Sequence, residues 1–352
     1  MKKNLILLTS TLIFVIFIFE IFIRIFFPQD LQRYWATHET SYGLIINKPN
    51  YHHKLHRFKN YKTSYSFGKF YNRLNDNYEK LSEKPKILVL GESFTFGWLL
   101  DNEETFVGKL QKDNPDFNFI NSSVGAWGSS HYTLFADLYC DDIKPKKIIL
   151  FLNSDDAYRG FRSQFYKMKN SIFTKNKLSF SDLNSESNFD KKIPFYKFFK
   201  SNSHLFMFTR NIVYNLIHKP YYNPWSTERY WPRPNGEFDT NFSEDVSVYN
   251  QKVYLKLKEI SNLCKAELHI INLMWVKPDK LYETNPNKVF LKSAKSFFNA
   301  NAINYYENSE NMESLYSAPE KYLIPIDFHP NKSGADLIYL AVKDYVSQIL
   351  SY

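Results

Sequence analysis

A serine that directly follows an apolar run is the first residue with a recognisable chemical use. The segment "KILVLGESFTFGWLL", residues 86–100, begins with a buried-strand pattern, breaks at Gly-Glu-Ser and continues with helical character. Sites in open parallel sheets form where strands end, and a helix that begins there offers backbone N–H groups. Gly91 lets the turn form without a Cβ clash. Ser93 is therefore either a nucleophile or the cap of the next helix, a role that Thr95 could also fill.

A second group of polar residues lies far away, in "IPIDFHPNKSGAD". Asp327 and His329 are two apart, so in an extended segment their side chains point to the same side. Pro330 ends this segment, because the residue before a proline avoids helical geometry. With Ser93 they provide a nucleophile, a base and an orienting carboxylate. The alternative is that Asp327 caps a turn and His329 is a surface residue, and we favour the triad.

Short apolar runs that alternate with helical spacing indicate how these residues are positioned. The expected strands are 86–91, 117–125, 146–153 and 266–276, and the expected helices include 103–113, 130–143 and 248–264. This alternation is typical of a parallel sheet that is covered on both faces. A last helix follows Pro330, where Ser333 and Asp336 resemble a capping box.

Three blocks of the sequence resemble a known family. "GESFTFG", "SSVGAWG" and "DFHPNKSG" are similar to the first, second and last blocks of the SGNH (GDSL-like) hydrolase superfamily. The resemblance covers roughly residues 84–160 and 260–350. It extends to the subset with a single N-terminal membrane helix and a Pro-Asn-containing connector, here "INKPN". It implies a flavodoxin-like three-layer α/β/α sandwich that hydrolyses esters or transfers acyl groups.

The resemblance also implies a role for each residue of the site. Ser93 would be the nucleophile, His329 the general base and then the general acid, and Asp327 the residue that orients the imidazole. The oxyanion hole would consist of the backbone N–H groups of Ser93 and Gly125 and of an asparagine side chain. The first block usually has Asp where this chain has Glu92, a change outside the triad.

The third block departs from the family pattern Gly-x-Asn-Asp and reads "FLNSDDAYRG". Alignment without a gap puts Asp155 in the asparagine position, where an ionised carboxylate would repel the developing oxyanion. Either Asn153 serves instead, or Asp155 is protonated, or backbone donors suffice, and we favour Asn153. Asp156, Arg159 and Trp127 are possible substrate contacts, although Arg159 could simply pair with an acid.

The N-terminus reads "MKKNLILLTSTLIFVIFIFEIFIRIFFP", an apolar run that only Glu20 and Arg24 interrupt. At about 1.5 Å per residue the run reaches roughly 34 Å, enough to cross a bilayer. A cleaved signal peptide would be shorter and would end in small residues, so we expect a retained anchor. Glu20 and Arg24 share a helix face and can pair. Lys2 and Lys3 favour a cytoplasmic N-terminus, with the catalytic domain periplasmic or extracellular.

Composition divides the rest of the chain. We expect an anchor at 1–27, a connector at 28–82 and an SGNH hydrolase-like domain at 83–352 with an insertion at about 157–245. The connector has three histidines, His52, His53 and His56. Because they lie in a basic stretch without a carboxylate or cysteine at ligand spacing, we predict no metal.

The insertion is too long for an ordinary connection and has an aromatic cluster, "KPYYNPWSTERYWPRPNG". It is interpreted as a lid or a substrate-binding subdomain. Trp225, Tyr230 and Trp231 either stack on sugar rings or form a small local core.

The net charge of +9 is spread along the chain, and no helix-turn-helix, zinc-finger or RNP pattern is present. We therefore predict no nucleic-acid partner, and a basic surface attracted to anionic lipid or polysaccharide instead. Cys140 and Cys264 are too few for a disulfide framework and are expected to be buried free thiols.

The predicted protein is a membrane-anchored extracytoplasmic serine esterase or O-acyltransferase without a cofactor. Its substrates would be acyl esters, mainly acetyl, of a cell-envelope or exported glycan, or small esters. A membrane acyltransferase is a possible partner. The alternative is a non-catalytic glycan-binding or assembly-factor protein on an SGNH-like scaffold.

Overall fold

Two compact units make up the chain in the computed structural model. Unit 1 comprises 1–34, 55–64 and 184–224, and unit 2 comprises 35–54, 65–183 and 225–352. The structure describes all residues except 1, 30, 32–34, 40, 59–60, 75–82, 154, 170–171, 178–194, 218–239, 275–285, 326 and 352.

A five-stranded sheet forms the centre of unit 2, with the order β11-β10-β7-β5-β6. All neighbouring strands are parallel. The strands are β5 (Lys86–Leu90), β6 (Asn118–Asn121), β7 (Lys147–Leu152), β10 (Glu267–Asn272) and β11 (Asn304–Tyr306). In chain order the five strands lie 2-1-3-4-5, the flavodoxin-like order. The predicted α/β fold is confirmed.

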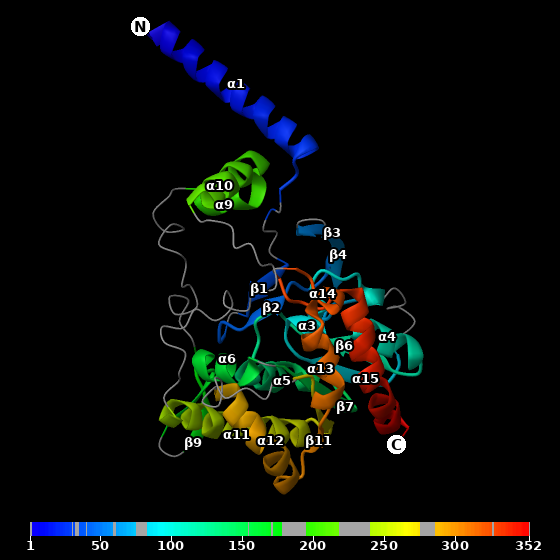
Figure 1. Ribbon diagram of the computed structural model, residues 1–352. Coiled ribbons are helices and arrows are strands. Elements are labelled where there is room, and N and C mark those ends of the chain that lie inside the picture. Colours follow the sequence, from blue (N-terminus) through cyan, green and yellow to red (C-terminus); the bar gives the residue numbers. More distant parts are fainter. Residues whose placement is uncertain are drawn as a thin grey trace. The chain divides into compact units, whose positions relative to one another are not determined.

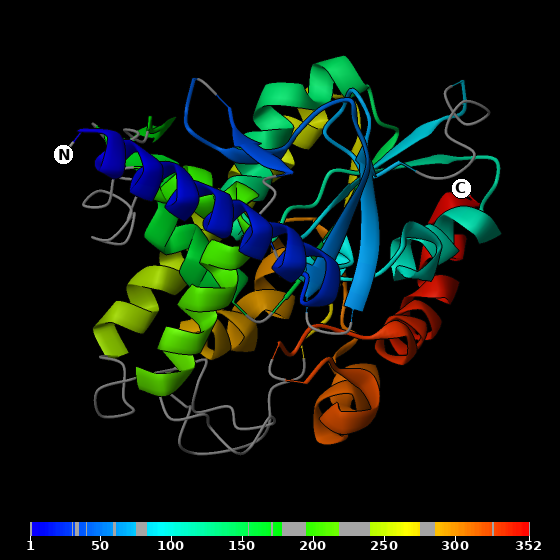
Figure 2. The ribbon, with the colours of Figure 1, turned by 90° about the horizontal axis from the view of Figure 1, so that it is seen from above.

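The alternation of side chains along β5 divides the core into two halves. Leu88 and Leu90 are buried on one face, and Ile87 and Val89 on the other. The first face is covered by α5 (Ser129–Ile143), α11 (Thr240–Leu263) and α12 (Pro286–Ala300), and the second by α4 (Phe106–Asp113), α13 (Ser309–Ser317) and α15 (Lys332–Leu350). Figure 2 shows α4 and α15 together on one side of the sheet. Unit 2 is thus a three-layer sandwich.

The remaining described elements outside α1, α9 and α10 are short. They are β1 (Ala36–His38), β2 (Ile45–Asn47), β3 (Tyr51–Phe58), β4 (Tyr61–Phe67), α3 (Ser93–Phe96), the 3₁₀ turn η1 (Asn102–Glu104), α6 (Asp156–Ser163), β8 (Tyr166–Lys169), β9 (Ile172–Lys175) and α14 (Pro319–Tyr322). Part of the segment expected as a connector lies in unit 2, where Leu44 and Ile46 are buried with the residues of the first face. The side chains of His52, His53 and His56, on β3, lie outside the described part.

The start of α15 corrects a sequence expectation. Asn331 caps this helix by accepting a hydrogen bond from the Gly334 N–H at 3.0 Å. Ser333 lies inside the first turn, so it cannot form the expected capping box with Asp336. The Asp336 carboxylate instead pairs with Lys109 of α4 at 2.5 Å. The cap lies two residues after His329 and fixes where the helix begins.

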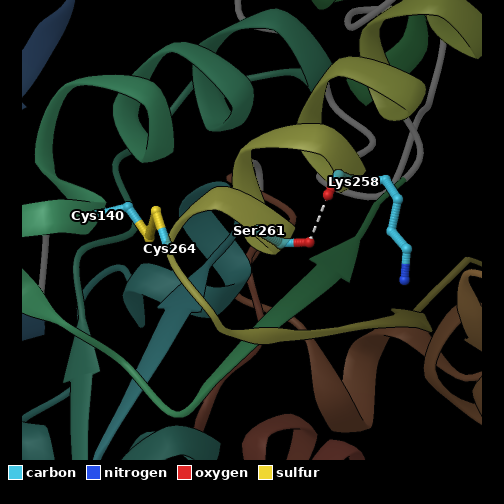
Figure 3. Close-up of a disulfide and its surroundings, with 4 residues drawn as sticks. All are labelled: Cys140, Lys258, Ser261 and Cys264. Atoms are coloured by element: carbon cyan, nitrogen blue, oxygen red, sulfur yellow. Dashed lines mark hydrogen bonds between the residues drawn. A yellow bond between two sulfur atoms is a disulfide. The ribbon is translucent and has the colours of Figure 1, made fainter.

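The two cysteines form a disulfide, which corrects the expectation of free thiols (Figure 3). Cys140 lies near the C-terminal end of α5, and Cys264 follows α11 directly, with the two Cα atoms 6.0 Å apart. The bond forms because α5 and α11 pack side by side on the same face of the sheet and end close together. The last turn of α11 is closed by Ser261, whose hydroxyl donates to the Lys258 carbonyl at 2.8 Å.

Unit 1 contains α1 (Lys2–Phe26), α9 (Tyr196–Asn202) and α10 (His204–Ile217). Among the described residues, α1 is the one helix long and apolar enough to cross a membrane, and it is either a signal sequence or an anchor. The expected insertion is divided between the units, since α9 and α10 belong to unit 1 and α6, β8 and β9 to unit 2. The aromatic residues Trp225, Tyr230 and Trp231 lie outside the described residues.

Candidate active site

The candidate site lies where the order of the strands reverses. β5 and β7 are neighbours, and their carboxyl ends lead into Ser93 and Asn153. In open α/β sheets a crevice forms at this switch point, because the connections on its two sides run to opposite faces. The topology therefore brings together two loops that are separated by some sixty residues.

Helix α3 holds Ser93 at its first position. Glu92 is the N-cap, and its carboxyl group accepts hydrogen bonds from the N–H groups of Ser93 and Phe94. A Cβ at Gly91 would lie 2.1 Å from the Thr95 hydroxyl oxygen, so only glycine lets the helix approach the strand this closely. Gly97 ends the helix in the left-handed conformation, with φ of 78°.

The structure brings the three expected side chains into one hydrogen-bonded chain. His329 Nε2 lies 2.7 Å from Ser93 Oγ, and His329 Nδ1 lies 2.8 Å from Asp327 Oδ2. A carboxylate at Nδ1 favours the tautomer whose proton is on Nδ1, which leaves the Nε2 lone pair facing the hydroxyl. The side chains of His329 and Asp327 are 22% and 15% exposed, so the imidazole can be reached by a substrate.

The loop before His329 is a turn and not the extended segment that we expected. The N–H groups of Asp327 and Phe328 both donate to the Ile324 carbonyl, at 3.2 and 2.9 Å. Phe328 has a φ of 59°, a left-handed conformation that costs a non-glycine residue on the order of 1–3 kcal/mol. Asp327 and His329 therefore meet because the chain bends between them. Strain of this kind is found where the surrounding structure fixes a functional side chain.

Glu92 has more contacts in the site than its sequence position indicated. It is 3% exposed, and its carboxyl group accepts from the Ser93 N–H and from Asn153 Nδ2, the latter at 2.5 Å. It also contacts Ser93 Oγ, and Arg159 Nη1 lies 3.7 Å away. Two of the three expected oxyanion donors thus donate to Glu92. The third expected residue, Gly125, is adjacent, since a Cβ there would lie 3.7 Å from Ser93 Cβ.

The third block gives its two candidate residues different surroundings. Asn153 is 5% exposed, and its Oδ1 accepts from the Tyr316 hydroxyl at 3.5 Å while its Nδ2 faces Glu92. The Asp155 carboxylate lies 3.1 Å from Arg159 Nη2, and its side chain is 22% exposed. Asn153 therefore lies beside the Ser93 backbone, whereas Asp155 is engaged with a cation.

The three possible substrate contacts also differ. Trp127 is 1% exposed and packs in the core, with its indole N–H donating to the Ile45 carbonyl at 2.7 Å. Asp156 is fully buried and accepts from the Asn153 N–H at 2.6 Å. Burial, together with the charge of Glu92, raises the pKa of Asp156 well above its usual range. Arg159, with a third of its side chain exposed, is the accessible member of this group.

Arg73 is a further residue near the site, and sequence reasoning did not single it out. It is 2% exposed and donates to the carbonyls of Phe96, Gly97 and Leu100 at 2.8–2.9 Å. These contacts hold the turn that follows α3. Burial lowers the pKa of Arg73 to about 10, so it is a cation at neutral pH. Arg73 lies in the segment 28–82 that we expected to be a connector, so the sequence did not indicate that it holds the turn after α3.

Among the described residues, no group of three or more His, Cys, Asp or Glu side chains is arranged to hold a metal ion.

The aromatic rings of Phe94 and Trp98 lie beside the imidazole of His329, with ring centroids 5.8 and 6.0 Å away. The surroundings of the imidazole are thus apolar on the side of α3.

No protein-family model matches the chain, and no curated protein gives a significant match. Solved structures are similar to it. The psychrotrophic esterase EstA from Pseudoalteromonas sp. is 15% identical, with a TM-score of 0.45, 76% of this chain covered and 100% of its own. A lipolytic G-D-S-L family protein from Veillonella parvula is 11% identical, with a TM-score of 0.41, 74% of this chain covered and 96% of its own. A GDSL-like lipase from Bacteroides thetaiotaomicron is 9% identical, with a TM-score of 0.36, 77% of this chain covered and 90% of its own.

Proposed function

We propose that the protein is a serine esterase or O-acyltransferase. The observation that supports this function is the hydrogen-bonded chain from Asp327 through His329 to Ser93. Ser93 Oγ attacks the ester carbonyl carbon while its proton passes to His329 Nε2. When the tetrahedral intermediate collapses, the ester C–O bond breaks and the leaving alcohol takes that proton. Asp327 stabilises the imidazolium that exists between the two transfers.

The acyl-enzyme then reacts with a second nucleophile. His329 takes a proton from water, which gives hydrolysis, or from an acceptor hydroxyl, which gives acyl transfer, as the oxygen of that nucleophile bonds to the acyl carbon. When this second tetrahedral intermediate collapses, the bond between the acyl carbon and Ser93 Oγ breaks, and Oγ takes the proton back from His329. The negative charge on the carbonyl oxygen would be stabilised by the N–H groups of Ser93 and Gly125 and by Asn153 Nδ2. Since Glu92 accepts from two of these donors, its carboxyl group must withdraw when a carbonyl oxygen binds.

We place the reaction outside the cytoplasm, on acetyl or other short acyl esters of a cell-envelope or exported glycan. The apolar α1, retained as an anchor, and the two lysines before its apolar run support a catalytic domain on the outer side. The disulfide supports an oxidising compartment. The net charge of +9 and the partly exposed Arg159 suit an anionic polysaccharide.

The full chain in detergent tests the nucleophile. Wild type should hydrolyse p-nitrophenyl acetate and be labelled by a fluorophosphonate on the peptide that contains Ser93. Ser93→Ala should lose both properties, whereas Ser333→Ala, at an exposed serine of α15, should keep both. Equal rates in wild type and Ser93→Ala would reject the assignment.

A second function is favoured by one observation. Glu92 accepts from both the Ser93 N–H and Asn153 Nδ2, so its carboxyl group occupies the donors of the expected oxyanion hole. A protein that binds a glycan without catalysing a reaction would not need these donors to be free. That function predicts glycan binding that survives Ser93→Ala and His329→Ala, and no labelling of the wild-type protein. Labelling at Ser93 together with turnover excludes it.

A further inference from the structure

The helical hairpin α9–α10 exposes an apolar surface. On α10 the exposed residues Thr209, Ile212, Val213 and Leu216 follow the three- and four-residue spacing of one helix face. Ile212, Val213 and Leu216 are 45%, 48% and 80% exposed. Exposed aromatic residues also lie on α9 and directly before it: Phe195, Phe198 and Phe199 are 76%, 60% and 42% exposed. Nothing else in the described residues of unit 1 covers these side chains.

Glu20 of α1 connects this hairpin to the apolar helix, and Figure 1 shows α9 and α10 near α1. Its carboxylate accepts from Ser203 Oγ at 2.8 Å and from the N–H groups of His204 and Leu205 at 2.9 Å each. Arg24, on the same helix face, pairs with it at 3.0 Å. An acidic residue within a membrane span requires such partners, because unsatisfied charge in hydrocarbon is costly. The first turn of α10 supplies them.

Further contacts fix the hairpin along the end of α1. The Gln29 N–H donates to His204 Nδ1 at 2.8 Å, and Asn211 Nδ2 donates to Gln29 Oε1 at 3.2 Å. The rings of Phe27 and Phe208 lie 5.8 Å apart. These partners set the depth of the first turn of α10, measured from the end of α1. Glu20 precedes Phe26, the last residue of α1, by six residues, which is about 9 Å along the axis of α1.

We propose that α9–α10 is a second membrane element, which lies in the interface of the leaflet where α1 ends and buries its apolar surface among the lipid chains. The estimated depth agrees with the roughly 5–10 Å to which interfacial amphipathic helices insert. The exposed Arg210 lies beside the apolar face of α10, where it can meet anionic headgroups. The contacts with Glu20 and Gln29 require that α1 is retained, so this inference holds whatever reaction the protein catalyses.

The test uses the full chain in nanodiscs that hold one copy each, made from zwitterionic and anionic lipid. Leu216→Cys is labelled with the environment-sensitive fluorophore NBD, and Leu340→Cys, at a 59% exposed residue of α15, is the matched control. The native cysteines do not react because they are paired. The label at 216 should show blue-shifted emission, quenching by doxyl lipid and loss of quenching by aqueous iodide, and the label at 340 should show none of these.

Two results overturn the proposal. One is equal quenching by iodide at 216 and 340, and the other is protection that appears only with several copies in one bilayer, which assigns the surface to a second chain. The coupling to α1 has its own test in the labelled Leu216→Cys background. Glu20→Ala should restore quenching by iodide, whereas Thr9→Ala, whose hydroxyl bonds only within α1, should not. Unchanged protection in Glu20→Ala refutes the coupling.

Discussion

The identity of the side chain that stabilises the oxyanion can be decided by a pair of neighbouring substitutions. Asn153→Ala removes the Nδ2 group, which lies beside Ser93 and is held by Glu92 at 2.5 Å. Asp155→Ala removes a carboxylate whose partner is Arg159. Both residues lie in the loop after β7, so each variant is the control for the other.

The structure gives these two changes different magnitudes. Loss of one buried oxyanion donor costs about 10²–10³ in kcat, or roughly 2.7–4 kcal/mol of transition-state stabilisation. We expect this loss for Asn153→Ala, with a smaller change in KM, because the donor acts on charge that develops only in the transition state. The Asp155–Arg159 ion pair is partly exposed on both sides, so its loss should lower the free energy of unfolding by only about 0.2–1 kcal/mol.

The assay is steady-state hydrolysis of p-nitrophenyl acetate by wild type and both variants, with thermal unfolding measured on the same samples. A larger loss of kcat in Asp155→Ala than in Asn153→Ala refutes the assignment. It would mean that Asp155, which occupies the family's asparagine position when the third block is aligned without a gap, is the oxyanion donor. Less than a tenfold loss in both variants shows that backbone N–H groups act without a side chain. Equal unfolding temperatures keep the comparison independent of stability.

Three further predictions concern stability and positioning. Burial, with the charge of Arg159, lowers the pKa of His131 from 6.5 to about 3, so the unfolded chain takes up a proton that the folded chain resists. The resulting loss of stability is absent above pH 6.5, and it grows by about 1.4 kcal/mol per pH unit as the pH falls towards 3. In urea unfolding, His131→Asn should flatten this dependence of the unfolding free energy on pH. An unchanged dependence contradicts the prediction. Replacing Cys140 and Cys264 by serine should cost about 2–4 kcal/mol of unfolding free energy, because the bond closes a span of 124 residues, and a cost near zero contradicts this. Gly91→Ala should lower esterase activity strongly, because its Cβ would lie 2.1 Å from the Thr95 hydroxyl oxygen and displace the helix that holds Ser93. Gly125→Ala has room for the added methyl group, 3.7 Å from Ser93 Cβ, so its unfolding temperature should equal that of wild type.

Much of the fold could be predicted because its central strands are continuous apolar runs. β5, β6, β7 and β10 all fall within expected strands, since residues buried on both faces leave an unambiguous pattern. β11 was missed because it has only three residues, Asn304–Tyr306, and they are half-buried or exposed at the sheet edge. The disulfide was missed because a spacing of 124 residues says nothing about which helix ends meet.

The candidate site was predicted in part for a topological reason. Ser93 follows a central strand, and the Asp327–His329 pair precedes the last helix, so both belong to loops that the parallel sheet gathers at one edge. The route by which the pair meets was not predictable, since no residue type announces a left-handed Phe328. The reach of Glu92 was missed as well. Its contact with Asn153 depends on the register between β5 and β7, which a local motif does not contain.

In the proposed reaction, Glu92 would also link substrate binding to the activation of Ser93. Ser93 has one hydroxyl hydrogen but two acceptors within contact, His329 Nε2 at 2.7 Å and the Glu92 carboxyl group. A hydroxyl that donates to Glu92 leaves its lone pairs facing the imidazole, which is unproductive for attack. In the proposed reaction, a carbonyl oxygen that takes the Ser93 N–H and Asn153 Nδ2 deprives Glu92 of its donors. The carboxyl group then moves away, and the hydroxyl is left with His329 as its acceptor. On this proposal, a bound ester would itself free the Ser93 hydroxyl for the attack.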